Sequence, residues 1–321
     1  MPEPPLVSVV IAVRNEAAHI GATLDAVLGQ DYPGPLEVVV ADGGSTDETP
    51  AILARRAASE PRIRLVDNPD SWVASGLNRA IEASRGEILV RCDGHAEPAP
   101  DYVRLAVELL DQTGAATVGG HQRAVGTTFV QRAVAIAMTS PFAVGNARFR
   151  YSKAAGPTDT VYLGVFPRRV LEEIGGFDPS LRRNQDYELN YRIRRAGKLV
   201  WFDPRLRVTY RPRSSLGTLW RQYLDYGRWK RVMLVRNPGS LAVRQTAPPL
   251  LVVGLLLSAL LGLIGVPLWW LAPAVYAAFL AVAAITESIR RGDRAAALLP
   301  LVMPTMHLAW GTGFLLVRTR G

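Results

Sequence analysis

Cysteine is nearly absent from this chain, whose 321 residues include only Cys92. A single cysteine excludes an internal disulfide and a cysteine-rich zinc site, so nothing in the sequence requires an oxidising compartment. Charged residues make up only 20% of the chain, and its 28 glycines follow no triplet period, which excludes coiled-coil and collagen-like proteins. Apolar residues are abundant instead, at 49% with a mean hydropathy of +0.11, and this balance points to membrane segments.

Several common binding signatures are also missing. No GxxxxGK[ST] phosphate loop occurs, and no GxGxxG follows the first apolar run, which argues against Walker-type nucleotidases and dinucleotide-binding enzymes. The zinc motif HExxH and the nucleophile motif GxSxG are absent too. The four histidines form no cluster at metal-ligand spacing. The chemistry of this chain must therefore rest on other residues.

Charge is missing from residues 245–286. Two apolar segments, 250–266 and 268–285, are each close to the ~20 residues that a helix needs to cross a bilayer. Residues 295–317 form a third candidate, interrupted by prolines and glycines, and we expect either a kinked span or a re-entrant hairpin there. The alternative, a buried hydrophobic hairpin of a soluble protein, is less favoured because such helices normally have a polar face.

Positive charge is concentrated immediately before these segments. Residues 205–246 contain ten basic residues and one acidic residue, Asp225. Within this stretch we expect a basic amphipathic helix that begins at Ser214 or Ser215 and ends at Asn237, with a composition suited to an anionic membrane surface. An ordinary surface helix that packs on the domain is the alternative, and both descriptions can hold together.

Charge also predicts the orientation in the membrane. Residues 1–5 lack the basic region of a secretory signal peptide, and the basic stretch precedes the first span. Arg290, Arg291 and Arg294 follow the second span, which agrees with the positive-inside rule. We therefore expect a multi-pass protein of the plasma (inner) membrane with a cytoplasmic catalytic domain. Two arginines near the C-terminus, Arg318 and Arg320, agree less well if the third segment crosses fully.

The first 204 residues alternate between short apolar runs and helical periodicity. Continuous β-branched runs predict strands buried on both faces, and the segments between them show helical spacing. This order predicts an α/β fold with a mostly parallel, doubly wound sheet. The expected strands are residues 7–13, 36–41, 63–66 and 86–92, and the expected helices are residues 17–29, 50–58 and 75–84.

Three polar residues follow directly after predicted strands. They are Arg14, Asp42 and Asp93. In parallel sheets, ligands bind outside the carboxyl ends of the strands, so we expect these side chains to line a binding site. Any one of them alone would be explained equally well as an ordinary turn residue.

Five motifs in order give the chain a family resemblance. They are VSVVIAVRNE (7–16), ADGGSTDET (41–49), RCDGHAEP (91–98), GGFD (175–178) and NQDYELNYR (184–192). Together they resemble family-2 inverting glycosyltransferases. The DTVYLG and RQYLDYGRWK stretches, followed by short C-terminal spans, are similar to the membrane-bound exopolysaccharide glucosyltransferases of the succinoglycan type. The resemblance implies the nucleotide-sugar transferase A fold.

The resemblance also implies a donor site. Asp42 matches the acid that hydrogen-bonds the uracil ring, while Ala12, Arg14 and Glu16 lie in the segment that lines the base and ribose. Asp93 belongs to an Asp-Gly-His triplet at the position of the family's DxD motif. The family's donor is a nucleotide sugar, and we expect a UDP-hexose.

The same resemblance implies a metal site and a base. Asp93 and His95 would hold a divalent cation that neutralises the departing diphosphate, and the imidazole favours Mn²⁺ over Mg²⁺. Asp186 matches the catalytic base that deprotonates the acceptor hydroxyl. The family's first acid of that pair is replaced by Gln185. A role for Asp186 as a helix N-cap is compatible with catalysis.

Four further residues are weaker candidates on the acceptor or membrane side, namely Gly164, Gln222, Arg228 and Trp229. The QxxRW motif of processive synthases is not met, because five residues separate Gln222 from Arg228. The predicted division of the chain has three parts. They are a nucleotide-sugar transferase domain (1–213), a basic interfacial segment (214–247) and a transmembrane region (248–321).

The sequence therefore predicts an inverting hexosyltransferase of the cytoplasmic membrane face. Its expected partners are a nucleotide-sugar donor, a lipid-linked saccharide or growing polysaccharide as acceptor, and membrane lipids. A processive polysaccharide synthase is the first alternative, and a non-catalytic nucleotide-binding membrane scaffold is the second. Nucleic acid is not an expected partner because the basic stretch adjoins a charge-free membrane segment. The oligomeric state stays open.

Overall fold

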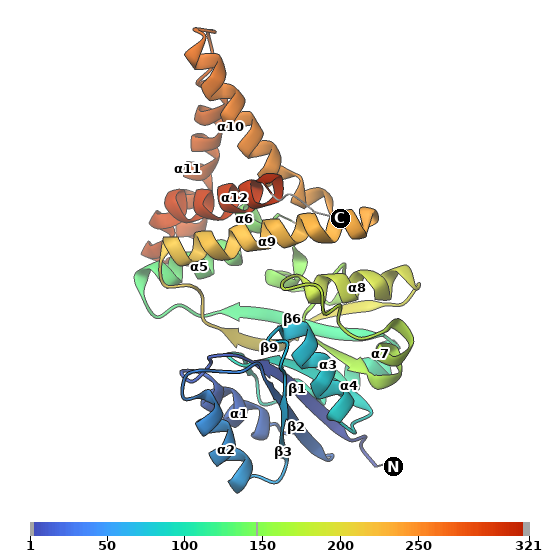
Figure 1. Ribbon diagram of the computed structural model, residues 1–321. Coiled ribbons are helices and arrows are strands. Elements are labelled where there is room, and N and C mark those ends of the chain that lie inside the picture. Colours follow the sequence, from blue (N-terminus) through green and yellow to red (C-terminus); the bar gives the residue numbers. More distant parts are fainter. Residues whose placement is uncertain (1–2, 146, 317–321) are drawn as a thin grey trace. The chain divides into compact units, whose positions relative to one another are not determined.

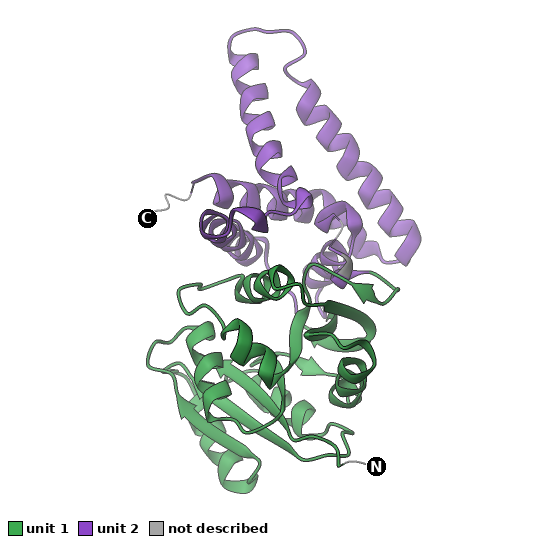
Figure 2. Cartoon of the chain, turned by 90° about the vertical axis from the view of Figure 1, so that its right-hand side faces the viewer, with its two compact units in different colours: residues 1–123, 152–210 green, residues 124–151, 211–321 purple. Residues whose placement is uncertain are grey.

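The computed structural model describes residues 3–145 and 147–316. The chain divides into two compact units, which Figure 2 shows in different colours. Unit 1 comprises residues 1–123 and 152–210, and unit 2 comprises residues 124–151 and 211–321.

Unit 1 is built on a nine-stranded sheet in the described part of the chain, with the order β3-β2-β1-β4-β8-β6-β9-β5 and with β7 paired to β9. The first four strands in this order are parallel. They are the apolar runs of the sequence. β1, β2 and β4 are buried along most of their length because helices cover them, whereas the edge strand β3 is mostly exposed. Their bounds are β1 (Val7–Val13), β2 (Leu36–Asp42), β3 (Ile63–Asp67) and β4 (Ile88–Asp93).

The other half of the sheet is antiparallel. Strand β8 runs against β4 and β6, and β9 runs against β5 and β7. The predicted α/β class is confirmed, and the four strands nearest the N-terminus pair in parallel. The bounds are β5 (Glu97–Pro98), β6 (Thr117–Ala124), β7 (Gly156–Pro157), β8 (Tyr162–Pro167) and β9 (Val200–Tyr210).

Helices of unit 1 connect the strands (Figure 1). The helix predicted for residues 17–29 begins later, at Ile20, because the polar segment before it forms a turn at the sheet edge. A core of buried aliphatic side chains, with Tyr102, lies between sheet and helices. The bounds are α1 (Ile20–Leu28), α2 (Thr49–Ser59), α3 (Val73–Ala83), α4 (Tyr102–Thr113), α7 (Arg168–Ile174) and α8 (Gln185–Arg195).

Unit 2 is helical. Its α-helices are α5 (Phe129–Met138), α6 (Pro141–Val144), α9 (Leu216–Arg236), α10 (Ala247–Leu263), α11 (Leu271–Arg291) and α12 (Leu299–Leu316). Short 3₁₀ helices connect them, namely η1 (Arg148–Arg150), η2 (Pro238–Ser240), η3 (Val243–Gln245) and η4 (Arg294–Leu298).

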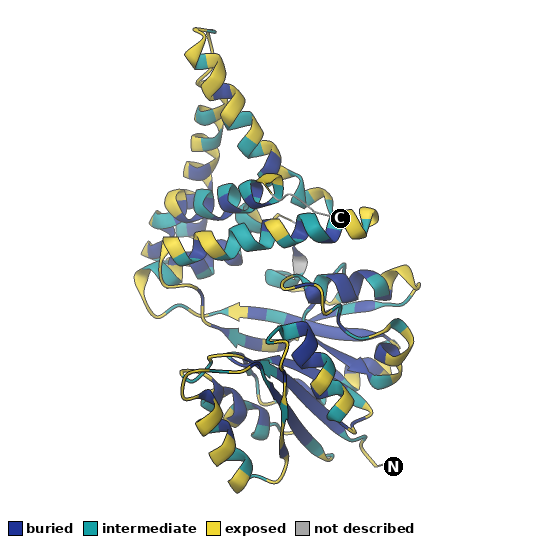
Figure 3. Cartoon of the chain, in the orientation of Figure 1, coloured by how far each residue is buried: buried dark blue, intermediate teal, exposed yellow. Residues whose placement is uncertain are grey.

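Helices α10 and α11 form a hairpin with an apolar exterior. Most of their surface is exposed or half-buried (Figure 3), including Leu256, Val275 and Ile285. Together with the segment Arg294–Leu316, they are long and apolar enough to cross a membrane. The turn between them has Gly265 in the left-handed region, at φ 73°. The predicted membrane segments are thus present, and the chain is a membrane protein.

For the third apolar segment, residues 295–317, the sequence predicts either a kinked span or a re-entrant hairpin. Helix α12 continues from Leu299 to Leu316 with Pro304 inside it, so a re-entrant hairpin is wrong for this segment. A continuous helix is possible because proline costs one hydrogen bond, and neighbouring helices pack around the rest. Residue 317 of the predicted span, with Arg318 and Arg320, lies outside the described residues.

Residues 124–151 group with the C-terminal helices, whereas the sequence places them in the first domain. The reason is side-chain burial and polar contacts within unit 2. Ser140 donates a hydrogen bond of 2.8 Å to the buried carboxylate of Glu287, and Arg291 donates to the Thr139 carbonyl. These residues are far apart in the sequence, so no local pattern shows their association.

The predicted basic helix is α9. Its N-cap is Ser215, whose side chain accepts from the amide of Thr218, and it ends at Asn237. It packs along α12 at glycines, since a Cβ on Gly227 would collide with the backbone of Trp310 and one on Gly313 with that of Leu224. The helix is therefore both basic and a packing partner, as the sequence allowed.

The amino-terminal edge of the sheet in unit 1 holds a buried carboxylate. Glu37 accepts hydrogen bonds from the Ser8 hydroxyl at 2.7 Å and from the Arg85 amide at 2.6 Å, and it pairs with the Arg85 guanidinium. Burial raises the pKa of Glu37, but the hydrogen bonds from Ser8 and Arg85 outweigh it, so the pKa lies below its ordinary value. The ionised carboxylate therefore stabilises the fold.

Replacing this carboxylate should expose a pH-dependent stability. The contribution of Glu37 is fully present above its ordinary pKa of 4.5 and is lost as the pH falls through the lowered folded value. We expect Glu37→Gln to cost about 1–3 kcal/mol at neutral pH, because an amide pairs poorly with these donors. The difference from wild type should shrink below pH 4.5. Thermal unfolding of the full chain in detergent at both pH values measures it.

The matched control is Glu108→Gln, whose half-exposed carboxylate pairs with Arg104 on α4. We expect little change there, because exposed ion pairs contribute little. Equal unfolding midpoints for wild type and Glu37→Gln at neutral pH would contradict the assignment.

Candidate active site

The carboxyl ends of β1, β2 and β4 bring three predicted residues together. Ala12 on β1 is paired in register with Asp93 on one side and Ala41 on the other, and Asp42 is paired with Val13. Asp42, Asp93 and the segment after Val13 therefore share one edge of the sheet, as predicted. Ala12 lies on the strand between the two acidic strand ends.

The loops after β1 and β2 are joined by hydrogen bonds. The Asn15 amide donates to the Ser45 hydroxyl and the Asn15 side chain accepts from the Thr46 amide, at 2.9 Å and 2.8 Å. Asn15 has a positive φ of 56°, which asparagine tolerates better than most residues. The Asp42 carboxylate accepts from the Ser45 hydroxyl at 2.6 Å. Arg14, at the start of this loop, is exposed.

The Asp-Gly-His turn follows β4 and lies against the loop after β1. A Cβ on Gly94 would come within 2.7 Å of Val13 and 3.2 Å of Glu16, so only glycine permits this approach. His95 Nδ1 lies 2.9 Å from the Glu16 carboxylate. The turn therefore holds Asp93, His95 and Glu16 in one cluster.

Asp186 lies in the first turn of α8. The N-cap is Asn184, with φ 63°, so an N-cap role for Asp186 is wrong. The helix is held to unit 1 by Arg192, which binds Glu188 and donates to the carbonyl oxygens of Ile174 and Gly176. These contacts fix the helix that carries Asp186.

A buried arginine connects the two halves of the site. Arg91 on β4 lies 2.7 Å from Asp93 through Nη2, and its Nη1 forms an ion pair with Asp186. Its side chain is 6% exposed, whereas those of Asp93 and Asp186 are 20% and 24% exposed. The charge of the guanidinium thus lies beneath two carboxylates that reach solvent.

Burial and the charges around Arg91 shift the pKa values of the neighbouring groups. Burial raises the pKa of Asp93, but the nearby Arg91 and His95 and a hydrogen bond from Tyr162 outweigh it, so the pKa lies below its ordinary value. Burial and then Asp93 raise the pKa of Tyr162 well above its usual range. Tyr162 therefore stays protonated and donates to Asp93 Oδ2 at 3.3 Å.

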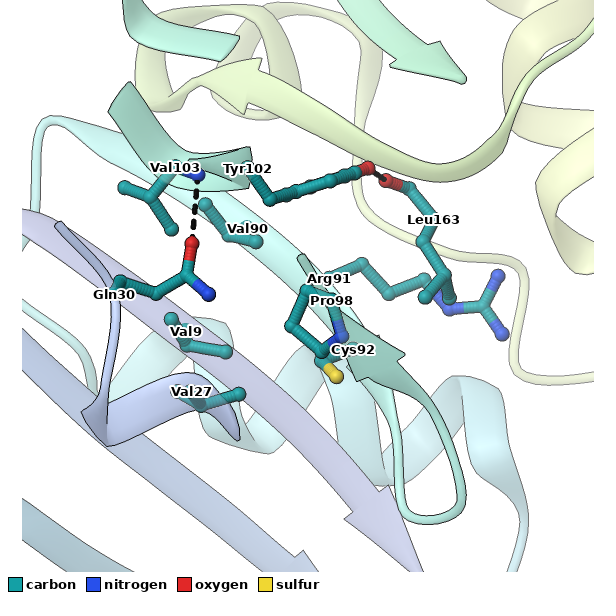
Figure 4. Close-up of a pocket in the computed structure, with 10 residues that line it drawn as sticks. All are labelled: Val9, Val27, Gln30, Val90, Arg91, Cys92, Pro98, Tyr102, Val103 and Leu163. Carbon is teal, nitrogen blue, oxygen red and sulfur yellow. Dashed lines mark hydrogen bonds between the residues drawn. The ribbon is translucent and has the colours of Figure 1, made fainter. Parts of the chain in front are cut away.

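Figure 4 shows the apolar side of the same strand, where Arg91 lines a small pocket. Its guanidinium points away from Val9 and Val27, and Tyr102 donates to the Leu163 carbonyl at 2.7 Å. Burial raises the pKa of both Cys92 and Tyr102. Each stays neutral, so the ionised neighbours of Arg91 are carboxylates on the other side.

The side chains at this turn suit a divalent cation that takes some of its ligands from the protein and the others from a substrate. No group of three or more His, Cys, Asp or Glu side chains able to hold a metal occurs in residues 3–145 and 147–316. Asp93 and His95 offer one carboxylate and one imidazole on one turn, a combination suited to Mn²⁺. They fit a cation that takes its remaining ligands from diphosphate oxygens.

The weaker candidates lie elsewhere. Gly164 is buried in β8, and a Cβ there would strike the Phe166 ring and the Thr117 hydroxyl, so packing explains this glycine. Gln222, Arg228 and Trp229 lie on α9 of unit 2. Gln222 donates to the Tyr226 hydroxyl at 3.0 Å, within that helix.

The sequence profile described as glycosyl transferase family 2 matches residues 8–175. The chain belongs to this family. It is 31% identical over 311 residues to the succinoglycan biosynthesis protein ExoA of Rhizobium meliloti (strain 1021), covering 95% of this chain and 93% of that protein. A second relative is a dolichyl N-acetyl-α-D-glucosaminyl phosphate 3-β-D-2,3-diacetamido-2,3-dideoxy-β-D-glucuronosyltransferase of Methanococcus voltae. It is 24% identical over 237 residues, which are 71% of this chain and 74% of that protein.

Solved structures support the fold. The mannosyltransferase PcManGT of Pyrobaculum calidifontis, in complex with GDP-Man and Mn²⁺, superimposes with a TM-score of 0.64 at 23% identity, covering 96% of this chain and 86% of that one. TarS (residues 1–349) of S. aureus, in complex with UDP, gives a TM-score of 0.50 at 13% identity, covering 96% and 90%.

The resemblance seen in the motifs is confirmed. The family-2 chain is a membrane glycosyltransferase that uses a nucleotide sugar, on the transferase A fold. Sequence reasoning overlooked Arg91. One signal was available, because Arg91 is the only charged residue inside the apolar run ILVRC, and a charge in a doubly buried strand requires a partner.

Removal of the metal should test whether Asp93 and His95 hold a cation that the reaction needs. We expect EDTA to stop nucleotide-sugar turnover, and Mn²⁺ to restore it better than Mg²⁺, because His95 offers a nitrogen ligand. His95→Asp should move the preference toward Mg²⁺, which favours oxygen. Release of nucleotide from the donor, measured in each ion, reads this out. Full activity in EDTA would contradict the assignment of a metal to this site.

Proposed function

We propose that the chain is an inverting hexosyltransferase that moves a hexose from a UDP-sugar to a lipid-linked saccharide at the cytoplasmic face of the plasma membrane. The observation that carries the proposal is the cluster at one sheet edge, where Asp42 and Asp93 end parallel strands and Asp186 is joined to Asp93 through Arg91. Donor and acceptor chemistry require such carboxylates within reach of each other.

The donor side rests on the loops after β1 and β2. Asp42 would accept a hydrogen bond from the uracil ring, and Ala12, Arg14 and Glu16 would line the base and ribose. Asp93 and His95 would hold the cation that neutralises charge on the departing diphosphate. The complexes with UDP and GDP-Man in solved relatives of this fold support a nucleotide sugar as the donor class.

The acceptor side rests on Asp186. Its carboxylate would take the proton of the acceptor hydroxyl while the hydroxyl oxygen attacks the anomeric carbon. The bond from that carbon to the diphosphate oxygen breaks on the opposite face, and its electron pair leaves with the nucleoside diphosphate. One displacement of this kind inverts the anomeric configuration. The ion pair with Arg91 favours the ionised carboxylate that a base requires.

A lipid-linked acceptor is favoured by the membrane segments. The 17 residues of α10 and the 21 residues of α11 span about 26 and 32 Å at ~1.5 Å per residue, close to the ~30 Å of a bilayer core. Trp269 and Trp270 at their turn are exposed, as in the aromatic belt of an interface. The names of the relatives, which concern succinoglycan and a dolichyl phosphate saccharide, agree with this class.

Helix α12 would then lie along the membrane surface. Figures 1 and 2 both show it beside α9 within unit 2, across the bases of α10 and α11. It is also more buried within the unit. Of its most apolar 18 residues, 44% are buried, against 11% for the first candidate span and 22% for the second. A helix that packs along an interfacial helix lies in the same plane. The two helices of the hairpin would therefore cross the membrane, and Leu316 would lie on the side of α9.

Asp186→Asn should separate catalysis from donor binding. The amide has the shape of the carboxylate but cannot take a proton, so we expect transfer to fall by about 10²–10⁴-fold with little change in UDP affinity. Membranes that contain the full chain, incubated with UDP-glucose, UDP-galactose or GDP-mannose, report turnover through nucleotide release. Calorimetry with UDP and Mn²⁺ reports binding.

The control is Asp178→Asn, a carboxylate that binds Ser180 in an exposed loop. Transfer by Asp186→Asn within threefold of wild type would contradict the role of Asp186 as base. Nucleotide binding without any turnover by the wild type, across the donors, would favour the scaffold instead. A long polymer from one donor without primer would favour a processive synthase.

Single cysteines should reveal the topology of unit 2. In a Cys92→Ser background we expect Ile264→Cys, in the exposed end of the hairpin, to react with a membrane-impermeant maleimide in intact cells. Val235→Cys on α9 and Leu316→Cys on α12 should react only in inverted vesicles. If Leu316→Cys reacts together with Ile264→Cys, α12 crosses the membrane fully.

A further inference from the structure

Arg91 forms and breaks no bond in the step proposed above, yet it contacts both carboxylates on which that step depends. We propose that Arg91 is a positioning residue, which holds Asp186 ionised and at a fixed separation from Asp93. The inference rests on the proposed role of Asp186 as base, and it assigns the guanidinium to the junction between donor and acceptor.

The first support is geometry. Arg91 lies on β4, between β1 and β8 in the sheet, and is paired in register with Val10 of β1. Its two terminal nitrogens go to different carboxylates, Nη2 to Asp93 and Nη1 to Asp186. The planar guanidinium sets the angle between these two contacts. A strand of the sheet thereby controls the position of a side chain on α8.

The second support is electrostatics. Without Arg91, Asp186 would lose the buried positive charge with which it pairs and would bind a proton more readily. Tyr162 donates a hydrogen bond to Asp93 but carries no charge, and Cys92 and Tyr102 are neutral. His95 is engaged by Glu16. Arg91 is therefore the cation that directly pairs with Asp186 among the ion pairs of the described residues.

The third support is the unfavourable burial of arginine nitrogens in the sheet, which only a specific role explains. Both Nε and Nη1 of Arg91 are buried without a hydrogen-bond partner in the described part of the chain, although Nη1 forms the ion pair with Asp186. An unsatisfied buried donor is unfavourable, and a doubly buried strand would be more stable with an apolar residue at this position. The two contacts of the terminal nitrogens offset this cost. Packing alone gives no reason for arginine here.

The arrangement predicts an antagonism between Arg91 and the metal. The guanidinium and a divalent cation both draw on the Asp93 carboxylate, and the two positive charges repel each other. Loss of Arg91 should therefore tighten the binding of Mn²⁺ while it weakens transfer. A general loss of structure would weaken both, so this opposite response identifies the positioning role.

The experiment compares Arg91→Gln and Arg91→Lys with wild type in the full chain. For Arg91→Gln we expect kcat to fall by about 10- to 100-fold, the range for a lost hydrogen bond to a charged group. Mn²⁺ alone, followed by electron paramagnetic resonance, should bind more tightly. The acidic limb of the pH–rate profile should move to higher pH, because Asp186 then binds a proton more readily.

Arg91→Lys should recover part of the loss. Its ammonium keeps the charge but is a single point that cannot hold two carboxylates in a fixed fork. We expect the pH profile to return close to that of wild type, while kcat stays below it. The matched control is Arg85→Gln, which removes an arginine from the buried Glu37 at the opposite edge of the sheet. It should lower stability without a change in Mn²⁺ binding or pH profile.

Two outcomes overturn the inference. One is a wild-type kcat and pH profile in Arg91→Gln. The other is a parallel loss of Mn²⁺ binding, activity and thermal stability, which makes Arg91 a merely structural residue. Asp186→Asn, assayed beside them, keeps the two proposals apart. If Asp186→Asn is inactive and Arg91→Gln is normal, only the positioning role fails, whereas an active Asp186→Asn removes the proposed base itself.

Discussion

The site depends on one interaction, in which the buried guanidinium of Arg91 lies beneath the carboxylates of Asp93 and Asp186. A guanidinium inside a sheet is unfavourable unless its charge is balanced, and Arg91 meets this condition through the carboxylates of Asp93 and Asp186. Because the arginine belongs to a central strand, the position of α8 relative to the sheet edge follows from the pairing. The contacts of Arg192 with Glu188 and nearby carbonyls fix the same helix from its other side.

Small residues at the sheet edge make this arrangement possible. Gly94 lets the turn after β4 approach Val13 and Glu16, and Gly76 lets α3 approach Ala12 on the strand between the two acidic strand ends. Hydrogen bonds between the loops at Asn15 and Ser45 hold the opposite wall. The site therefore combines rigid strand ends with loops that constrain each other, and such preorganisation is what positions a reacting pair.

Unit 2 follows a different physical rule. Its hairpin exposes apolar side chains that only a lipid environment covers favourably, while α9 and α12 bury glycines against each other's backbones. Glu287 is fully buried near the end of α11, where Ser140 and Arg291 satisfy its carboxylate. Polar groups in such a helical unit require internal partners, and this requirement draws residues 124–151 into it.

Local patterns in the sequence determined the elements themselves. Apolar runs predicted β1 to β4. In β1, β2 and β4 the reason is burial by helices, whereas the edge strand β3 is mostly exposed. Charge-free segments predicted the membrane helices because a bilayer core excludes charge. Acidic residues after strands located Asp42 and Asp93, since carboxyl ends of parallel strands share an edge. Only tertiary structure decided the pairing of Arg91 with Asp186, the contact of Glu16 with His95, and the membership of residues 124–151 in unit 2. Each of these joins residues far apart in the chain, and such contacts depend on how elements pack rather than on any local periodicity.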